Sequence, residues 1–73
     1  MQPTPDQIDM YATLITTNKM SPSQIQVLAG GMGQQGRAFL RNVTTKALEK
    51  DPNFSFEEAE STYQLVKSPL FQN

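Results

Sequence analysis

Cysteine, histidine and tryptophan are all absent from this chain of 73 residues. The absence of cysteine excludes disulfides, thiolate metal sites and a thiol nucleophile, and the absence of histidine removes the commonest general base. Glu57, Glu58 and Glu60 form a cluster of carboxylates, but acidic side chains near the start of a helix complement the helix dipole. The composition therefore predicts a protein that is not an enzyme and that binds no metal or cofactor.

Large apolar residues are also scarce. Leu, Ile, Val and Phe number sixteen, about 22% of the chain and just above the roughly 20% level associated with disorder. A domain of this size buries only about 60% of the surface that its unfolded chain exposes. No apolar run approaches the roughly 20 residues of a membrane span. We therefore expect one small helical domain over residues 1–73, with a thin core, with residues 1–3 and 68–73 as flexible tails, and with no membrane contact.

The charge balance gives no strong attraction to a polyanion. The formal net charge is −1, so the molecule as a whole is not drawn to nucleic acid or to an anionic membrane. The first ten residues, "MQPTPDQIDM", are polar and acidic, unlike a signal peptide with its basic start and apolar centre. We expect a cytoplasmic location.

Three short segments have the pattern of a helix start. "TPDQI" at residues 4–8 and "SPSQI" at residues 21–25 each contain a hydroxyl residue, then proline, then glutamine three positions after the hydroxyl. This is a capping box with proline at the first helical position, in which two side chains satisfy backbone N–H groups that lack a partner within the helix. "SFEE" at residues 55–58 has the same spacing with glutamate. The three segments predict three helix starts.

Apolar residues recur at helical spacing after these starts and again after residue 36. Asn18, Pro52 and Pro69 stand where such segments should end. The sequence thus predicts an all-α fold, a small bundle of three to four short helices at residues 5–17, from residue 22, 36–50 and 56–67. Their expected apolar faces consist of Ile8, Tyr11, Ala12 and Ile15; Ile25, Leu28 and Ala29; Phe39, Leu40, Val43 and Ala47; and Phe56, Ala59, Tyr63 and Val66.

All four glycines of the chain fall within "GGMGQQG" at residues 30–36. A glycine inside a helix costs roughly 1 kcal/mol relative to alanine, so this density opposes one continuous helix. Glycine also permits positive φ and close approach of two backbones. We interpret the segment as a Gly-rich corner between helices two and three.

Gly31, Gly33 and Gly36 also have the G-x-G-x-x-G spacing that resembles the dinucleotide-binding turn of Rossmann dehydrogenases. That resemblance implies a strand ending near Leu28 and a phosphate held at the start of the following helix. The strand would have to begin inside a well-formed helix start, and no second strand follows residue 50, although a parallel βαβ unit requires one. Nucleotide binding through Gly31–Gly36 is therefore the third functional alternative.

"LAGGMG" at residues 28–33 fits the L-A-x-x-x-G run of a helix-turn-helix, with Phe39 and Val43 as later apolar positions. This resemblance implies a DNA-binding recognition helix at residues 34–42, and residues 37–50 carry a local charge of +3. Arginine and glutamine suit base edges, but an acidic chain offers few cations to phosphates. A DNA-binding protein is the second alternative, with the contact residues Gln34, Gln35, Arg37, Arg41 and Asn42.

Weak chemistry, strong helix signals and a thin core favour a non-catalytic protein–protein interaction module, such as a small regulator or assembly factor. A protein partner is expected, and a C₂ homodimer would enlarge the core. Each candidate contact residue has a competing interpretation as a core residue. The candidates are Phe54, Phe56, Tyr63, Leu70, Phe71, Met10 and Met32.

Overall fold

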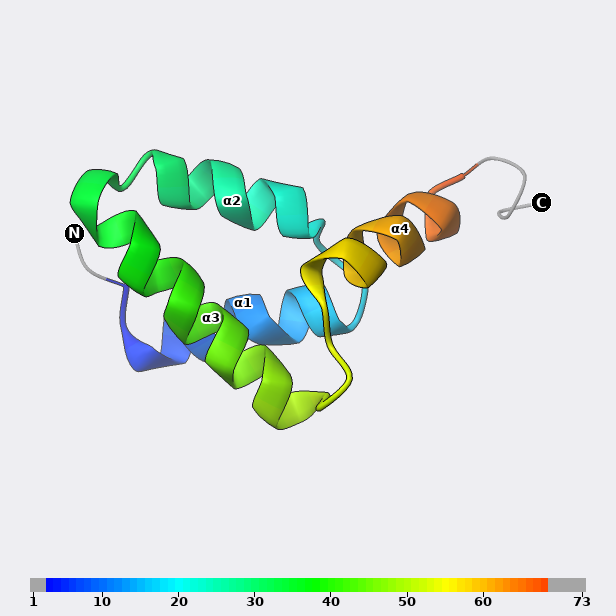
Figure 1. Cartoon of the computed structure of the whole chain (residues 1–73), viewed down its shortest axis with the longest axis horizontal. Coiled ribbons are helices and arrows are strands. Elements are labelled where there is room, and N and C mark those ends of the chain that lie inside the picture. Colours follow the sequence, from blue (N-terminus) through cyan, green and yellow to red (C-terminus); the bar gives the residue numbers. More distant parts are fainter. Residues whose placement is uncertain (1–2, 69–73) are drawn as a thin grey trace.

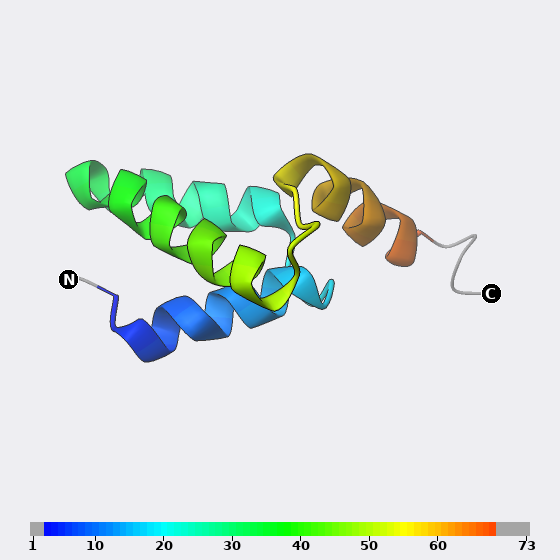
Figure 2. The same ribbon diagram turned by 60° about the horizontal axis from the view of Figure 1, so that its bottom comes forward.

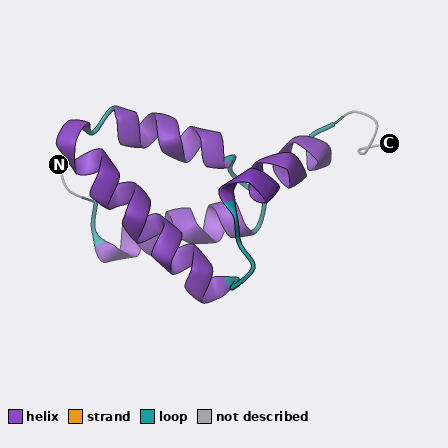
Figure 3. Ribbon diagram, in the orientation of Figure 1, coloured by secondary structure: helices purple, strands orange, loops and turns teal. Residues whose placement is uncertain are grey.

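The structure, a computed structural model, describes residues 3–68, and within that range it contains four α-helices, one 3₁₀-helix and no strand. In chain order the elements are α1 (Pro5–Thr16), α2 (Pro22–Gly30), η1 (Gly33–Gln35), α3 (Gly36–Lys50) and α4 (Phe56–Val66) (Figures 1 and 3). The predicted all-α class is confirmed. The predicted ends of α1 and α4 each lie one residue beyond the observed ones.

Both predicted proline-containing capping boxes are complete. At α1, the Gln7 backbone N–H donates to the Thr4 hydroxyl at 3.1 Å, and the Thr4 N–H donates to the Gln7 side chain at 2.9 Å. At α2, Ser21 and Gln24 form the equivalent box. At α4, the Ser55 hydroxyl accepts from the Glu58 N–H at 3.1 Å. These bonds place the helix starts where the sequence predicted them.

Local sequence also determines where α1 and α3 end. Asn18 adopts φ 61°, a left-handed conformation that asparagine tolerates better than most residues. The Lys19 N–H then donates to the Leu14 carbonyl at 2.9 Å, which closes α1 with a Schellman bond. At α3, Asp51 is extended, as expected for a residue that precedes proline.

The Gly-rich corner lies between α2 and α3, as predicted. Gly33 has φ +66°, the left-handed region that favours glycine. Gly36 is buried, and a Cβ added there would lie 2.1 Å from the Ala29 carbonyl oxygen. The corner therefore uses one glycine for its backbone conformation and another for the close approach of α3 to α2.

The buried core comes entirely from α1, α2 and α3. The Tyr11 ring packs edge-to-face on Phe39, with ring centroids 5.5 Å apart. Partly buried Tyr11, Met20, Met32 and Leu40 extend this core. Leu28, expected on the apolar face of α2, is instead 36% exposed. The buried hydrophobic residues are Ile8, Ala12, Ile15, Ile25, Ala29, Phe39, Val43 and Ala47.

The four helices do not contribute equally to the fold. α3 packs most extensively against α1 and also against α2, so it is the central helix. Figures 1 and 2 show α3 turning back beside α2 from the corner, while α4 projects from the opposite end of the molecule. Among the described residues of α4, none is fully buried. The fold is a three-helix core with a peripheral fourth helix.

Candidate protein-interaction site

The first turn of α2 is joined to α4 by one carboxylate. Glu60 accepts hydrogen bonds from the Ser21 hydroxyl, from the Ser23 backbone N–H at 3.0 Å and from the Ser23 hydroxyl at 2.9 Å. Gln64, one turn further along α4, donates to its other oxygen at 2.8 Å. A negative charge at a helix N-terminus is favourable because unpaired N–H groups point toward it. Glu60 therefore holds α4 at the start of α2.

These hydrogen bonds stabilise the charged form of the Glu60 side chain. The Ser21 hydroxyl is the largest cause, followed by Gln64 and the Ser23 backbone, and together they lower the pKa of Glu60 from 4.5 to about 2. Ser21 itself is buried, with only 4% of its surface exposed. The carboxylate is thus used in a structural contact between two helices, and it stays ionised at neutral pH.

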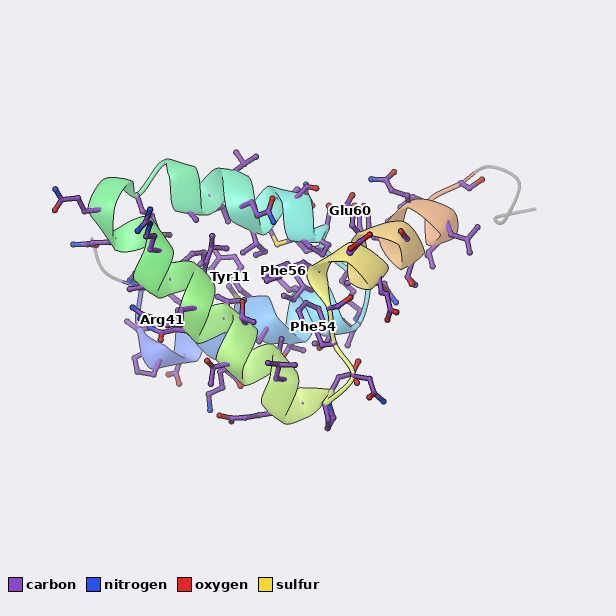
Figure 4. The ribbon with its side chains drawn as sticks, in the orientation of Figure 1. Tyr11, Arg41, Phe54, Phe56 and Glu60 are labelled. Atoms are coloured by element: carbon purple, nitrogen blue, oxygen red, sulfur yellow. The ribbon has the colours of Figure 1, made fainter. Side chains whose placement is uncertain are left out.

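Three of the seven expected contact residues pack against the core. Phe54 and Phe56 lie edge-to-face, with ring centroids 5.3 Å apart, and both are partly buried against the core (Figure 4). Met32, in the corner, packs against the same cluster. The competing interpretation of these residues as core residues fits these positions.

The other four expected contact residues are dispersed or lie outside the described range. Met10 is 47% exposed on α1. Tyr63, on α4, is partly exposed, and the Lys67 ammonium lies 5.6 Å from the centre of its ring. Leu70 and Phe71 lie outside residues 3–68. The structure therefore does not gather the seven residues into one surface.

The five expected DNA contacts are all exposed, but they divide between two flanks of α3. Gln35 and Asn42 line a groove with Ile8 of α1. Arg37 and Arg41 lie on the flank nearer α2, because they are on the side of α3 opposite Lys50, which pairs with Asp9 of α1 at 2.9 Å. Gln34 lies in η1 before α3 begins.

The Gly31–Gly36 segment lacks the strand that the dinucleotide-binding fingerprint implies. Residues 22–30 form α2, and the segment after α3 leads into α4. Gly36, which would have the third glycine role, lies against Ala29 of α2. The resemblance is limited to the spacing of the glycines.

The outward face of α2 carries exposed apolar side chains that were not among the expected contacts. Val27 is 76% exposed and Leu28 is 36% exposed. They line a shallow depression together with Met20, Ser23 and Gln24. We refer to these five residues as the α2 face.

The α2 face belongs to a long uncharged segment. Residues 20–36 contain none of the chain's thirteen charged side chains. The cores of protein–protein interfaces are similarly depleted of charged residues. This uncharged stretch is visible in the sequence, and it is the signal that could have identified the face.

Gly30 and Gly31, at the end of α2, have no evident role inside the molecule. A Cβ at Gly30 would meet nothing within 4 Å, and a Cβ at Gly31 would make only ordinary contact with the Leu28 carbonyl oxygen at 3.5 Å. Neither residue has positive φ. Alanine at the end of a helix would be more favourable, so internal packing does not explain these two glycines.

The remaining exposed large apolar residues are isolated on other helices. Leu65 on α4 is 58% exposed and Leu48 on α3 is 42% exposed. Single exposed residues of this kind are common on protein surfaces, whereas grouped ones mark binding sites. The α2 face is therefore the strongest candidate contact surface.

Over residues 3–68, the structure contains no cluster of carboxylates that could hold a metal ion. No helix in the same part of the chain is both long enough and apolar enough to cross a membrane. Comparisons with protein-family models, with curated proteins and with solved structures gave no match to this chain.

Proposed function

We propose that the protein is a non-catalytic interaction module, a small regulator or assembly factor, and that it binds another protein chain through the α2 face. The observation that carries the proposal is the 76% exposure of Val27 on a helix without charged residues. Covering an apolar side chain with a partner removes it from water, which favours association.

The structure of the α2 face suits this role. Its backbone is fixed at both ends, by the capping box at Ser21 and by the packing of Ala29 against Gly36. A contact surface on a rigid helix loses little conformational entropy when a partner binds. Ser23 and Gln24 beside Val27 supply uncharged hydrogen-bonding groups.

A DNA-binding role through residues 34–42 has less support. Figures 1 and 2 show α2 and α3 as an αα-hairpin, whereas the two helices of a helix-turn-helix cross at a wide angle. A titration of duplex DNA with salt tests this alternative. Binding whose salt dependence is weakened in a protein with both Arg37→Ala and Arg41→Ala would support it.

The interaction proposal is tested by affinity capture with the Val27→Glu variant. A charge at the centre of an apolar contact is costly because it must lose its hydration. We expect Val27→Glu to lose the proteins that the unmodified chain retains. The matched control is Ala38→Glu, which adds the same charge at an exposed position of α3 that lines the groove with α1.

Mass spectrometry identifies the retained proteins. Loss from both variants would indicate a general charge effect, and an identical set with Val27→Glu would refute the role of the α2 face. Circular dichroism of each variant separates lost binding from lost folding.

A further inference from the structure

We infer that the partner of the α2 face is a second copy of this chain, with the two α2 helices packed antiparallel across a two-fold axis near Val27. This inference rests on the proposed function and names the occupant of the same face. Three observations support it: the absence of charge on the face, the two unexplained glycines and the distribution of charge around α2.

The absence of charge makes the face self-complementary. In a two-fold interface each residue meets the same surface of the other copy, so a charge near the axis faces its like. Residues 20–36 contain no charged side chain, and Val27, near the middle of α2, would lie against its own copy. A partner selected by charge would instead require an opposite charge on the face.

The glycines fit the same arrangement. In an antiparallel pair centred on Val27, Gly30 and Gly31 lie opposite Gln24 and Ser23 of the partner copy. Glycine allows backbones and longer side chains to approach closely. The open space beside Gly30 would accommodate the Gln24 side chain of the other copy. This gives a role to residues that internal packing leaves without one.

Charged residues of opposite sign flank the two ends of α2. Glu60 binds at its first turn, and Glu57 is exposed on the same helix, α4. Arg37 and Arg41 lie near its other end, on the flank of α3 closer to α2. Figure 4 shows Glu60 and Arg41 toward opposite ends of the molecule, with α2 extending between them.

This distribution selects the antiparallel orientation. Antiparallel pairing brings the acidic end of each copy over the basic end of the other, and it does so twice. Parallel pairing would bring like charges together at both ends, which is unfavourable. The nine residues of α2 form a short contact, so we expect a weak dimer with a dissociation constant on the order of 100 µM.

Sedimentation equilibrium of the full chain over a range of concentrations tests the inference. We expect a monomer–dimer equilibrium that Val27→Glu weakens by about 30-fold or more, as for a residue at an interface centre. Ala38→Glu should leave the equilibrium unchanged. Gly30→Ala should weaken it several-fold while the helical circular-dichroism signal is retained.

A charge exchange tests the orientation. Arg37→Glu should weaken the dimer by roughly two- to five-fold, since exposed ion pairs contribute little. Adding Glu57→Arg to the same chain should restore the dimer, because the exchanged charges again meet across the interface. A parallel pair would show no such rescue.

Several outcomes would overturn the inference: a monomer up to about 1 mM, a dimer insensitive to Val27→Glu, or no rescue by the charge exchange. A chain that stays monomeric, while Val27→Glu still loses captured proteins that Ala38→Glu retains, refutes self-pairing and leaves the proposed function standing. Loss of neither self-association nor captured proteins refutes both.

Discussion

The three-helix core and α4 are held in the molecule by different kinds of interaction. All eight buried hydrophobic residues belong to α1, α2 and α3. α4 is attached by the Glu60 carboxylate at the first turn of α2 and by the partly buried Phe54–Phe56 pair. One attachment is continuous apolar packing, and the other is a polar contact beside a small aromatic one.

This difference implies different free energies of opening. Elements with few buried apolar contacts open locally at lower cost than the whole molecule unfolds. We therefore expect α4 to separate from the core in a local event, while α1, α2 and α3 unfold together. The following experiments test this division, beginning with the largest expected effect.

Gly36→Ala should produce the greatest loss of stability. The added Cβ would lie 2.1 Å from the Ala29 carbonyl oxygen and 2.9 Å from its carbonyl carbon, so the two helices must move apart. We expect the free energy of unfolding to fall by roughly 3 kcal/mol or more, measured by urea denaturation. Gly31→Ala is the control, because its Cβ would make only ordinary contact. Equal losses in the two variants would contradict the close approach at Gly36.

Phe56→Ala should weaken the attachment of α4 and leave the core intact. Because Phe56 is only partly buried, we expect a loss of roughly 1–2 kcal/mol, below the 3–5 kcal/mol typical of a fully buried phenylalanine. Amide hydrogen exchange should accelerate in α4 and not in α3.

Phe39→Ala provides the comparison for this experiment. Phe39 is 2% exposed, so its removal should accelerate exchange in all of the helices. Uniform acceleration in Phe56→Ala as well would show that α4 and the core form one cooperative unit.

Acid should release α4 through Glu60. The pKa of Glu60 is about 2 in the folded protein against an ordinary value of 4.5. Because the folded value is the lower one, its contribution to stability is fully present above pH 4.5 and is lost as the pH falls toward 2. The exchange rates of the α4 amides should rise over that interval.

Glu60→Gln should remove most of this pH dependence and leave α4 less protected at neutral pH. Glu58→Gln, an exposed position of the same helix, is the matched control and should retain the wild-type profile. Asp9, whose pKa is lowered by its hydrogen bond with Lys50, also titrates at low pH, so the measurement follows the α4 amides and not global unfolding. An unaltered profile in Glu60→Gln would contradict the role of the carboxylate.

Gly30→Ala should have the smallest effect, and in the opposite direction. Since the space beside Gly30 is open, alanine should raise the stability of the dilute monomer by about 0.5–1 kcal/mol. Thermal unfolding at low protein concentration measures this gain. Gly33→Ala should instead lower stability, because Gly33 has φ +66°. A loss in Gly30→Ala would show that this glycine has a role within the folded chain.

The sequence predicted the helices well because their boundaries are encoded locally. Thr4 and Ser21 with their glutamines, Asn18 and Pro52 act within a few residues of the ends that they determine. The Gly-rich corner was predictable for the same reason. Its division of labour between Gly33 and Gly36 required the packing of α3 on α2.

The candidate site was less predictable. The Glu60–Ser23 contact joins residues 37 positions apart, and no local pattern indicates such a pair. Periodicity alone put Leu28 on the inner face of α2, although the short, tilted contact with α3 leaves it exposed. Val27 is visible as a helical residue in the sequence, but its exposure depends on which side of α2 the other helices cover.

The confinement of the core to residues 8–47 has a consequence for the order of folding. All buried apolar contacts can form among α1, α2 and α3 before α4 takes its place. α2 and α3 are neighbours in the chain, and contacts between nearby segments form quickly because little loop entropy is lost. The serine hydroxyls at the start of α2 would then be hydrated first and receive the Glu60 carboxylate in the last step of assembly.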